Sequence, residues 1–335
     1  MKDNITATLT RKDFVSDQEV RWCPGCGDYA ILAQTQKTLP DLGIPKENIV
    51  FISGIGCSSR FPYYMNTYGF HSIHGRAMTV ASGLKITRPE LLVFVVTGDG
   101  DGLSIGGNHL LHSLRRNMDL NIILFNNRIY GLTKGQYSPT SKIGKKTVSS
   151  PFGSIEQPIK PARIALAAEA SFVARTIATD TQHLAKTLTM AANHRGGTFV
   201  EIYQNCNVYN DGAFDYFAER SIRPEMTVNI EHGKPLIFGK NNDKGIKLDG
   251  LNPVVCDVSD PDILVHNEKS ASIALPYLLS EMTAPELPVA LGVLRSLDLP
   301  TYEDRLSEQI VEAKSKFGEG DAHKLLHGGD TWTVQ

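Results

Sequence analysis

A pair of cysteines near the start of the chain could support three kinds of chemistry. Cys23 and Cys26 are separated by Pro and Gly, which hold two thiols close together in a tight turn. Such a pair can be a redox dithiol, half of a zinc site or half of an iron–sulfur site. The pair alone does not distinguish these uses, so the answer depends on which other side chains reach the same place.

Two motifs further along the chain have the chemistry of a diphosphate and magnesium site. Residues 98–102 read G-D-G-D-G, and Asn127, in N-N-R, lies 28 residues after Asp99. The glycines let the backbone approach a phosphate, and Asp99 and Asn127 offer the oxygen ligands that Mg²⁺ prefers. Either motif alone is common in turns. Together, at this spacing, they are the signature of thiamine diphosphate enzymes, so the sequence predicts thiamine diphosphate with Mg²⁺.

The elements that must position these residues follow a repeated β-α-β pattern. Apolar runs alternate with amphipathic segments from about residue 49, and residues 91–97 are apolar throughout, as in a parallel strand covered on both faces. The sequence therefore predicts an α/β fold with a doubly wound, largely parallel sheet. We expect strands at residues 48–53, 91–97, 120–126, 171–176 and 197–203, and helices at 76–87, 104–116, 162–170, 181–194 and 302–316.

Two more cysteines follow expected strands, so four could meet at the carboxyl edge of the sheet, where such folds bind ligands. Cys57 and Cys206 are these two, and Cys256 is expected to be an ordinary buried thiol. Four thiolates can hold Zn²⁺ or a [4Fe–4S] cluster. The isolation of Cys57 and Cys206 from each other disfavours zinc, and a dithiol would leave both unexplained. From the residues alone, cluster, zinc and dithiol all remain open, with the cluster favoured.

Composition limits the class of protein. The 335 residues carry a net charge of −2, without the basic surplus typical of a dedicated nucleic-acid binder. The longest apolar run is far shorter than a membrane span, and the first residues lack an apolar signal-peptide core. Five scattered cysteines suit a reducing compartment. We therefore expect a soluble, cytoplasmic protein without a nucleic-acid or membrane partner.

Two further expectations concern organisation. Residues 53–59 look like the start of a dinucleotide-binding fingerprint, but Ser59 replaces the third glycine and no acidic residue stands near position 74, so a nicotinamide site is weakly supported. After about residue 225 the strand and helix pattern weakens. We expect a cofactor-binding domain over 1–225 and a C-terminal extension over 226–335.

Six motifs, taken together, resemble a known family. They are W-C-P-G-C-G at 22–27, I-G-C-S-S-R at 55–60, H-G-R at 74–76, G-D-G-D at 98–101, N-N-R-I-Y-G-L-T-K-G-Q at 126–136 and S-P-T at 138–140. In this order they resemble the β subunit of 2-oxoacid:ferredoxin oxidoreductases, especially the 2-oxoglutarate type. The resemblance covers about residues 20 to 225 and leaves the rest of the chain without a counterpart.

The resemblance implies the thiamine diphosphate-binding fold and a set of ligands. It implies a [4Fe–4S] cluster held by Cys23, Cys26, Cys57 and Cys206, and Mg²⁺ held by Asp99, Asn127 and the backbone carbonyl of Ile129. It also implies cofactor contacts from Ile55, Gly56, Cys57, Ser58, Gly100, Asp101, Gly131 and Leu132. The expected reaction is oxidative decarboxylation of a 2-oxoacid with coenzyme A (CoA), giving acyl-CoA, CO₂ and reduced ferredoxin. The alternative is a subunit of a non-oxidative 2-oxoacid decarboxylase, which would have no use for four converging cysteines.

The substrate and partners are also expected from the resemblance. Lys134, on the loop after the magnesium ligands, is expected to meet a substrate carboxylate or CoA, and His74 and Arg76 could orient the 2-oxoacid. The chain has room for one α/β domain of this kind. We therefore expect an α subunit that supplies the pyrimidine-binding domain and its catalytic Glu, in an (αβ)₂ heteromer that reduces ferredoxin.

Overall fold

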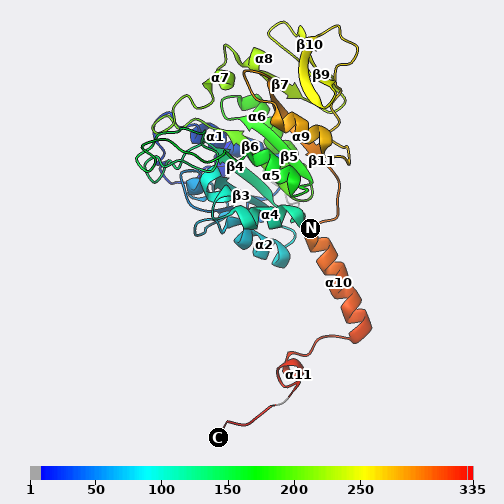
Figure 1. The fold of residues 1–335 in the computed structure, drawn as a ribbon. Helices are drawn as coiled ribbons and strands as arrows, with labels where there is room; N and C mark the ends of the chain where they lie inside the picture. Colours follow the sequence, from blue (N-terminus) through cyan, green and yellow to red (C-terminus); the bar gives the residue numbers. More distant parts are fainter. Residues whose placement is uncertain (1–8, 330, 335) are drawn as a thin grey trace.

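A mostly parallel eight-stranded sheet forms the centre of the computed structural model, which describes residues 9–329 and 331–334 (Figure 1). Its order is β2-β1-β3-β4-β6-β5-β11-β7, and every neighbouring pair is parallel except β5 with β11. The strands are β1 Ile49–Ser53, β2 Tyr68–His71, β3 Leu92–Gly98, β4 Asn121–Asn126, β5 Phe172–Ile177, β6 Thr198–Tyr203, β7 Thr227–Ile230 and β11 Val289–Ser296. The predicted α/β fold and its five expected strands are confirmed.

Helices cover both faces of this sheet. Helices α2 (Ala77–Thr87), α4 (Gly107–Arg115), α5 (Pro161–Ala167) and α9 (Ala274–Glu281) contribute to the core on one face. Helices α1 (Asp28–Thr38) and α6 (Thr181–Asn193) contribute to the core on the other. The strands serve both cores because side chains alternate between faces: Val93 and Val95 of β3 pack on one side, Phe94 and Val96 on the other. This explains the unbroken apolar run in β3.

The helix expected at 104–116 is present in a shorter form, and a separate short helix precedes it. A short helix, α3 (Asp99–Leu103), begins at Asp99 itself, and α4 begins only at Gly107. The turn between them packs against the loop after β2, where a Cβ on Gly75 would lie 2.6 Å from the backbone nitrogen of Gly106. Gly75 also has a φ of 70°, so both its backbone and its surroundings require glycine.

The segment after residue 225 differs from the extension that the sequence pattern suggested. Strands β7 and β11 complete the main sheet, and β8 (Ile237–Phe238), β9 (Lys244–Asp249) and β10 (Asn252–Asp257) form a separate antiparallel sheet. Helices α7 (Asp215–Ala218) and α8 (Arg223–Met226) precede β7. Strand β11 pairs with β5, more than 100 residues earlier in the chain, and such long-range pairing leaves no signal in local periodicity.

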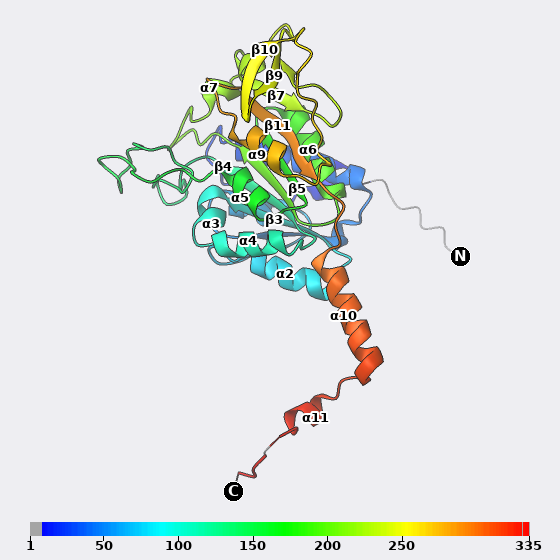
Figure 2. The same ribbon diagram turned by 45° about the vertical axis from the view of Figure 1, so that its right-hand side comes forward.

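The chain ends in an arm that leaves the body of the molecule. Helix α10 (Tyr302–Phe317) starts at the amino edge of the sheet, where the Tyr302 amide donates to the Asn117 carbonyl, and projects away together with α11 (Ala322–Leu326) (Figures 1 and 2). Ile310, Val311 and Phe317 are exposed on α10. Among the described residues, no helix is both long and apolar enough to cross a membrane.

Candidate functional site

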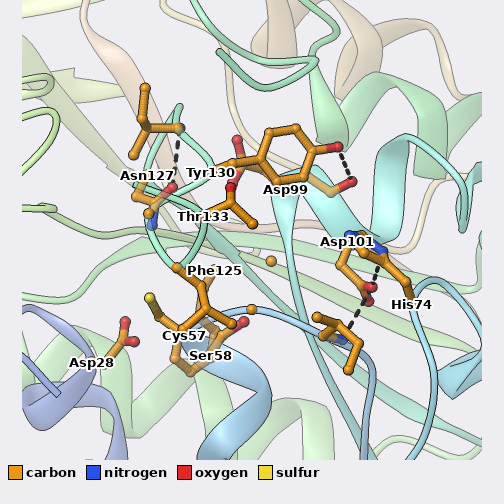
Figure 3. Close-up of a pocket in the computed structure, with 17 residues that line it drawn as sticks. Asp28, Cys57, Ser58, His74, Asp99, Asp101, Phe125, Asn127, Tyr130 and Thr133 are labelled. Atoms are coloured by element: carbon orange, nitrogen blue, oxygen red, sulfur yellow. Dashed lines mark hydrogen bonds and ion pairs between the residues drawn. The ribbon is translucent and has the colours of Figure 1, made fainter. Parts of the chain in front are cut away.

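Most of the sequence-predicted cofactor residues line one cavity at the carboxyl edge of the sheet (Figure 3). They come from the loops after β1, β2, β3 and β4. The predicted residues in the lining are Ile55, Gly56, Cys57, Ser58, His74, Asp99, Gly100, Asp101, Asn127, Ile129, Gly131 and Leu132. Asp28, Gly98, Phe125, Tyr130 and Thr133 complete it. We call this space the diphosphate cavity.

The carboxylate of Asp99 is buried and aimed by two hydroxyls. Ser138 donates to its Oδ2 at 2.6 Å, and Thr140 donates to the same oxygen. The other oxygen, Oδ1, receives no side-chain hydrogen bond from the residues that the structure describes. Burial raises the pKa of Asp99 to about 6, against the lowering effect of the two hydroxyls. A buried carboxylate with one oxygen held and the other available fits a metal ligand.

The turn after β4 supplies the remaining oxygens. Asn127 accepts a hydrogen bond from the Ile129 amide at 3.1 Å, and Asn210 donates to the Asn127 carbonyl at 2.8 Å. Arg128, between them, has a φ of 57°, a conformation that turns the backbone sharply. Within the described part of the chain, no donor reaches the Ile129 carbonyl oxygen. Asp99, Asn127 and this carbonyl therefore form an all-oxygen donor set compatible with Mg²⁺ beside a diphosphate.

Asp101 binds together the loops around the cavity. Its Oδ2 accepts from Thr97 at 2.8 Å, and its Oδ1 accepts from the amides of Ile55 and Gly75, at 3.1 and 2.7 Å. The Nδ1 of His74 lies 2.7 Å from the same Oδ1. Figure 3 shows Asp101 and His74 on one side of the cavity, with Asp28 and Cys57 on the other. Both oxygens of the Asp101 carboxylate therefore accept hydrogen bonds. These contacts connect the loops after β1 and β2 to α3.

Gly100 is required by an aromatic ring. A Cβ at this position would lie 2.6 Å from Cδ1 and Cζ of Tyr130, whose hydroxyl donates to the Gly100 carbonyl at 2.8 Å. The sequence suggested that the glycine admits a phosphate. The structure shows that it also admits the Tyr130 ring, which locks the turn after β4 to the start of α3.

We expect Gly100→Ala to weaken thiamine diphosphate binding at least tenfold, because the added methyl group must displace the Tyr130 ring and the turn that carries Asn127. Equilibrium dialysis against the cofactor would measure this. Gly83→Ala, on the exposed side of α2 where a Cβ meets nothing within 4 Å, is the matched control and should bind normally. Unchanged binding by Gly100→Ala would show that the Tyr130 contact is dispensable.

The four predicted cysteines line a second cavity. This cysteine cavity is lined by Cys23, Cys26, Cys57 and Cys206, and it shares Asp28, Cys57, Asn127, Gly131 and Leu132 with the diphosphate cavity. Gly131 lies between two of the thiols, since a Cβ there would be 3.5 Å from the Cys57 Sγ and 3.6 Å from the Cys206 Sγ. Cys256 lies apart from this cavity, half-buried on β10.

The thiols surround a space rather than a single point. No three His, Cys, Asp or Glu side chains within residues 9–329 and 331–334 are grouped closely enough to hold one metal ion. Burial raises the pKa of the Cys57 thiol to about 12 and raises that of Cys26 as well, so these thiols need a cationic centre to become thiolates.

Sequence reasoning missed several residues that shape the site. Asp28 is buried, lines both cavities and has a pKa raised to about 7 by burial, and its Oδ2 has no partner in the described structure. Its signal was its place directly after W-C-P-G-C-G. Trp22, in the same motif, donates to the Cys57 carbonyl at 2.7 Å. Ser138 and Thr140 belong to S-P-T, which contributed to the resemblance without an assigned role.

Two predicted substrate residues lie outside the lining of both cavities. Arg76 directs its side chain toward backbone carbonyls of His74, Gly75 and Ile105, at 3.4 to 3.5 Å. Lys134 is exposed on the loop just beyond Leu132 and Thr133, with a φ of 72°. His74 is the one of the three that lines the diphosphate cavity.

Comparisons with known proteins agree with this geometry. The family described as thiamine pyrophosphate enzyme, C-terminal TPP binding domain, matches residues 54–202. The chain is 52% identical over 329 residues to the 2-oxoglutarate oxidoreductase subunit KorB of Mycobacterium tuberculosis, covering 96% of this chain and 88% of that protein. It is 35% identical over 288 residues to 2-oxoacid:ferredoxin oxidoreductase 1, subunit beta, of Aeropyrum pernix, covering 86% and 81%.

A solved structure matches almost the whole chain. It is a 2-oxoglutarate:ferredoxin oxidoreductase from Magnetococcus marinus with 2-oxoglutarate, coenzyme A and succinyl-CoA bound, and it has a TM-score of 0.78 at 30% identity, with 98% of each chain covered. The match therefore includes the segment after residue 225, for which the sequence motifs offered no counterpart. The fold, the cavities and these relatives together show that the chain belongs to the β subunits of the 2-oxoacid:ferredoxin oxidoreductases.

Proposed function

We propose that this chain is the β subunit of a CoA-dependent 2-oxoglutarate:ferredoxin oxidoreductase. The observation that carries the proposal is the pair of adjoining cavities, one lined by oxygen donors and glycines and the other by four cysteines. Cys57 and Gly131 line both, so a group bound in one cavity would lie next to a group bound in the other. That arrangement suits a decarboxylation coupled to electron transfer.

The diphosphate cavity is the proposed place of thiamine diphosphate and Mg²⁺. Asp99, Asn127 and the Ile129 carbonyl would hold the metal, while Gly100, Asp101, Gly131, Leu132 and residues 55–58 would surround the cofactor. When bound, thiamine diphosphate supplies an electron sink for the decarboxylation of a 2-oxoacid. The chain's contribution is a preorganised site, in which Ser138 and Thr140 orient Asp99.

The cysteine cavity is the proposed place of a [4Fe–4S] cluster. Cys23 and Cys26 come from the tight turn before α1, Cys57 from the loop after β1 and Cys206 from the loop after β6. The side-chain amide of Gln204 donates to the Cys26 Sγ at 3.3 Å, a contact that would stabilise a thiolate and tune the potential of a cluster bound there. Electrons would leave through this cluster to ferredoxin.

The proposed partner is an α subunit that closes the diphosphate cavity, supplies the pyrimidine-binding domain and its catalytic Glu, and forms an (αβ)₂ heteromer. Ile73 and Ile105 are 71% and 53% exposed on adjacent loops beside His74. Apolar side chains at the rim of a cavity suit a surface covered by another subunit. We place the complex in the cytoplasm, where the cysteines would stay reduced until they bind iron.

The proposed substrates are 2-oxoglutarate and CoA. KorB of Mycobacterium tuberculosis carries 2-oxoglutarate in its name, and the Magnetococcus marinus enzyme was solved with 2-oxoglutarate and coenzyme A bound. Lys134 is the proposed contact for a substrate carboxylate or for CoA, because it projects from the loop whose neighbours Leu132 and Thr133 line the cavity. His74 would orient the 2-oxoacid from the lining, and Arg76 would support the His74 loop through its contacts with backbone carbonyls.

The test is an assay of the complex of this chain with its α subunit, purified without oxygen. Reduction of ferredoxin should be fastest with 2-oxoglutarate, slower with pyruvate and branched 2-oxoacids, and should require CoA. CO₂ release without CoA and without reduction of ferredoxin would instead identify a non-oxidative decarboxylase. Fastest reduction with pyruvate would overturn the proposed substrate while leaving the oxidoreductase assignment intact.

A further inference from the structure

A chain of buried polar side chains runs across the sheet beneath the proposed magnesium site. It begins at Arg175 on β5, continues to Glu201 on β6 and Asn126 at the end of β4, and reaches Asp99 through Thr140. Each of the five side chains belongs to a residue that is at most 3% exposed. Strands β5, β6, β4 and β3 are neighbours in that order, so the sheet itself brings the members together.

The contacts along this chain are continuous. Arg175 Nε donates to Glu201 Oε2 at 3.1 Å, and Asn126 Nδ2 donates to Glu201 Oε1 at 2.8 Å. The Thr140 hydroxyl contacts both Asn126 Oδ1, at 3.1 Å, and the Asp99 carboxylate, and it donates its single proton to one of these two acceptors at a time. At the far end, Arg175 Nη2 donates to the Ser280 carbonyl of α9 at 3.4 Å.

Glu201 determines which way Asn126 points. An ionised carboxylate only accepts hydrogen bonds, so the amide nitrogen of Asn126 must face Glu201 and its oxygen must face Thr140. With that oxygen fixed, it stands as an acceptor beside the Thr140 hydroxyl, which shares its proton between Asn126 and Asp99. Asn126 also precedes Asn127 directly, so the same contact fixes the start of the turn that carries the second magnesium ligand.

The stability of the fold does not explain why a charged pair is buried at this point of the sheet. Two charges removed from water lose so much solvation that an apolar pair of similar size often serves the fold as well. The pair Arg175 and Glu201 is nevertheless almost fully buried, with side chains 3% and 1% exposed, and its hydrogen bonds lead toward the metal ligands. Buried groups that orient metal ligands typically affect metal affinity.

We propose that Glu201 and Arg175 are positioning residues for the magnesium site, acting through Asn126 and Thr140 on Asp99 and Asn127. This inference rests on the magnesium site of the proposed function. Glu201→Gln places an amide nitrogen against either Arg175 or Asn126, both of which are donors, and frees the Asn126 amide to turn. Glu201→Asp keeps the charge but withdraws the carboxylate from Asn126 by one methylene.

The experiment measures thiamine diphosphate binding by equilibrium dialysis at increasing Mg²⁺, using the complex with the α subunit. Glu201→Gln should raise the Mg²⁺ concentration for half-saturation about tenfold to a hundredfold. Glu201→Asp should raise it at least a few-fold, and it decides the question if Glu201→Gln does not fold. At saturating Mg²⁺ both variants should recover turnover, since the defect lies in metal binding.

A double variant and a control separate positioning from general destabilisation. In Arg175→Gln/Glu201→Gln, the new amide at 201 can accept from Asn126 and donate to the amide at 175, so the Mg²⁺ requirement should return close to that of the wild type. Lys85→Met breaks another ion pair, between the buried Lys85 and the half-buried Asp119 at 2.6 Å on the amino edge of the sheet, and should leave the Mg²⁺ requirement unchanged.

The outcomes distinguish this inference from the function on which it rests. If wild-type binding of thiamine diphosphate needs Mg²⁺ but Glu201→Gln and Glu201→Asp behave like Lys85→Met, the positioning role is wrong and the magnesium site stands. If wild-type binding does not depend on Mg²⁺, the magnesium site itself is wrong.

Discussion

Replacing Asp99 with Asn should abolish the activity of the complex, because the change removes the one charged ligand proposed for Mg²⁺. Asn keeps the size of the side chain and loses the negative charge that a hard cation requires. We expect the affinity for thiamine diphosphate in the presence of Mg²⁺ to fall at least a hundredfold, in line with the about 10- to 100-fold losses seen even for groups that only support a ligand. Cofactor content after purification, together with turnover, measures the effect.

The same variant should fold normally, which separates loss of a ligand from loss of structure. Burial raises the pKa of Asp99 to about 6, above the value of 3.8 typical of an exposed carboxyl. The folded protein therefore holds its proton more tightly than the unfolded chain, so Asp99 stabilises the cofactor-free fold at low pH and loses this contribution as the pH rises through about 6. At pH 8, without cofactor, Asp99→Asn should have a Tm equal to or above that of the wild type. A much lower Tm, or normal cofactor binding, would contradict the assignment.

Replacing Cys206 with Ser should remove the proposed cluster and leave the thiamine site in place. Cys206 is the proposed ligand from the loop after β6, where the Asn210 backbone amide donates to the Cys206 carbonyl at 2.9 Å. A serine hydroxyl is a poor substitute for a thiolate on iron. We expect loss of iron and sulfide, and a fall in ferredoxin reduction of at least about a hundredfold, or about 2.7 kcal/mol in transition-state terms.

Cys256 provides the matched control for that change. It is half-buried on β10, outside both cavities, and Cys256→Ser should keep full iron content and full activity. Thiamine diphosphate binding should survive in both serine variants, because the oxygen ligands do not depend on Cys206. Equal iron content in Cys206→Ser and the wild type would show that the cysteine cavity does not hold the cluster.

The sequence was most informative where local chemistry and strand position coincide. The strand before Asp99 is apolar throughout, and Asn127 follows the next strand in the chain, so the rule that ligands bind at the carboxyl edge was enough to place both residues. The same rule placed Cys57 and Cys206, which come from the loops after β1 and β6. Their shared cavity with Cys23 and Cys26 agrees with this reasoning.

Residues whose roles depend on distant partners were beyond sequence reasoning. Glu201 stands in the buried strand F-V-E-I-Y, and only the pairing of β6 with β4 and β5 places it between Asn126 and Arg175. Asp101 was predicted to contact the cofactor. It does line the cavity, but its hydrogen bonds go to loops contributed by β1 and β2, which the sequence could not bring to it.

The C-terminal segment shows the same limit. Strand β11 joins the main sheet through antiparallel pairing with β5, in which Gly292 lies opposite Arg175. Gly292 has a φ of 126°, and no local sequence pattern predicts this conformation. The expectation of a C-terminal extension over 226–335 followed from the weakening of the β-α-β pattern after residue 225. Long-range pairing, rather than periodicity, determines where those strands lie.

The central claim is that oxidation of a 2-oxoacid in one cavity delivers electrons to a cluster in the adjoining one. The most direct test adds 2-oxoglutarate and CoA to the oxidised complex, purified without oxygen and free of ferredoxin, and records its visible absorbance together with its iron and sulfide content. The account predicts one [4Fe–4S] cluster per chain, whose visible absorbance bleaches on addition of 2-oxoglutarate and CoA and does not bleach in Asp99→Asn. A colourless complex with stoichiometric zinc, or a cluster that 2-oxoglutarate cannot reduce, would contradict it.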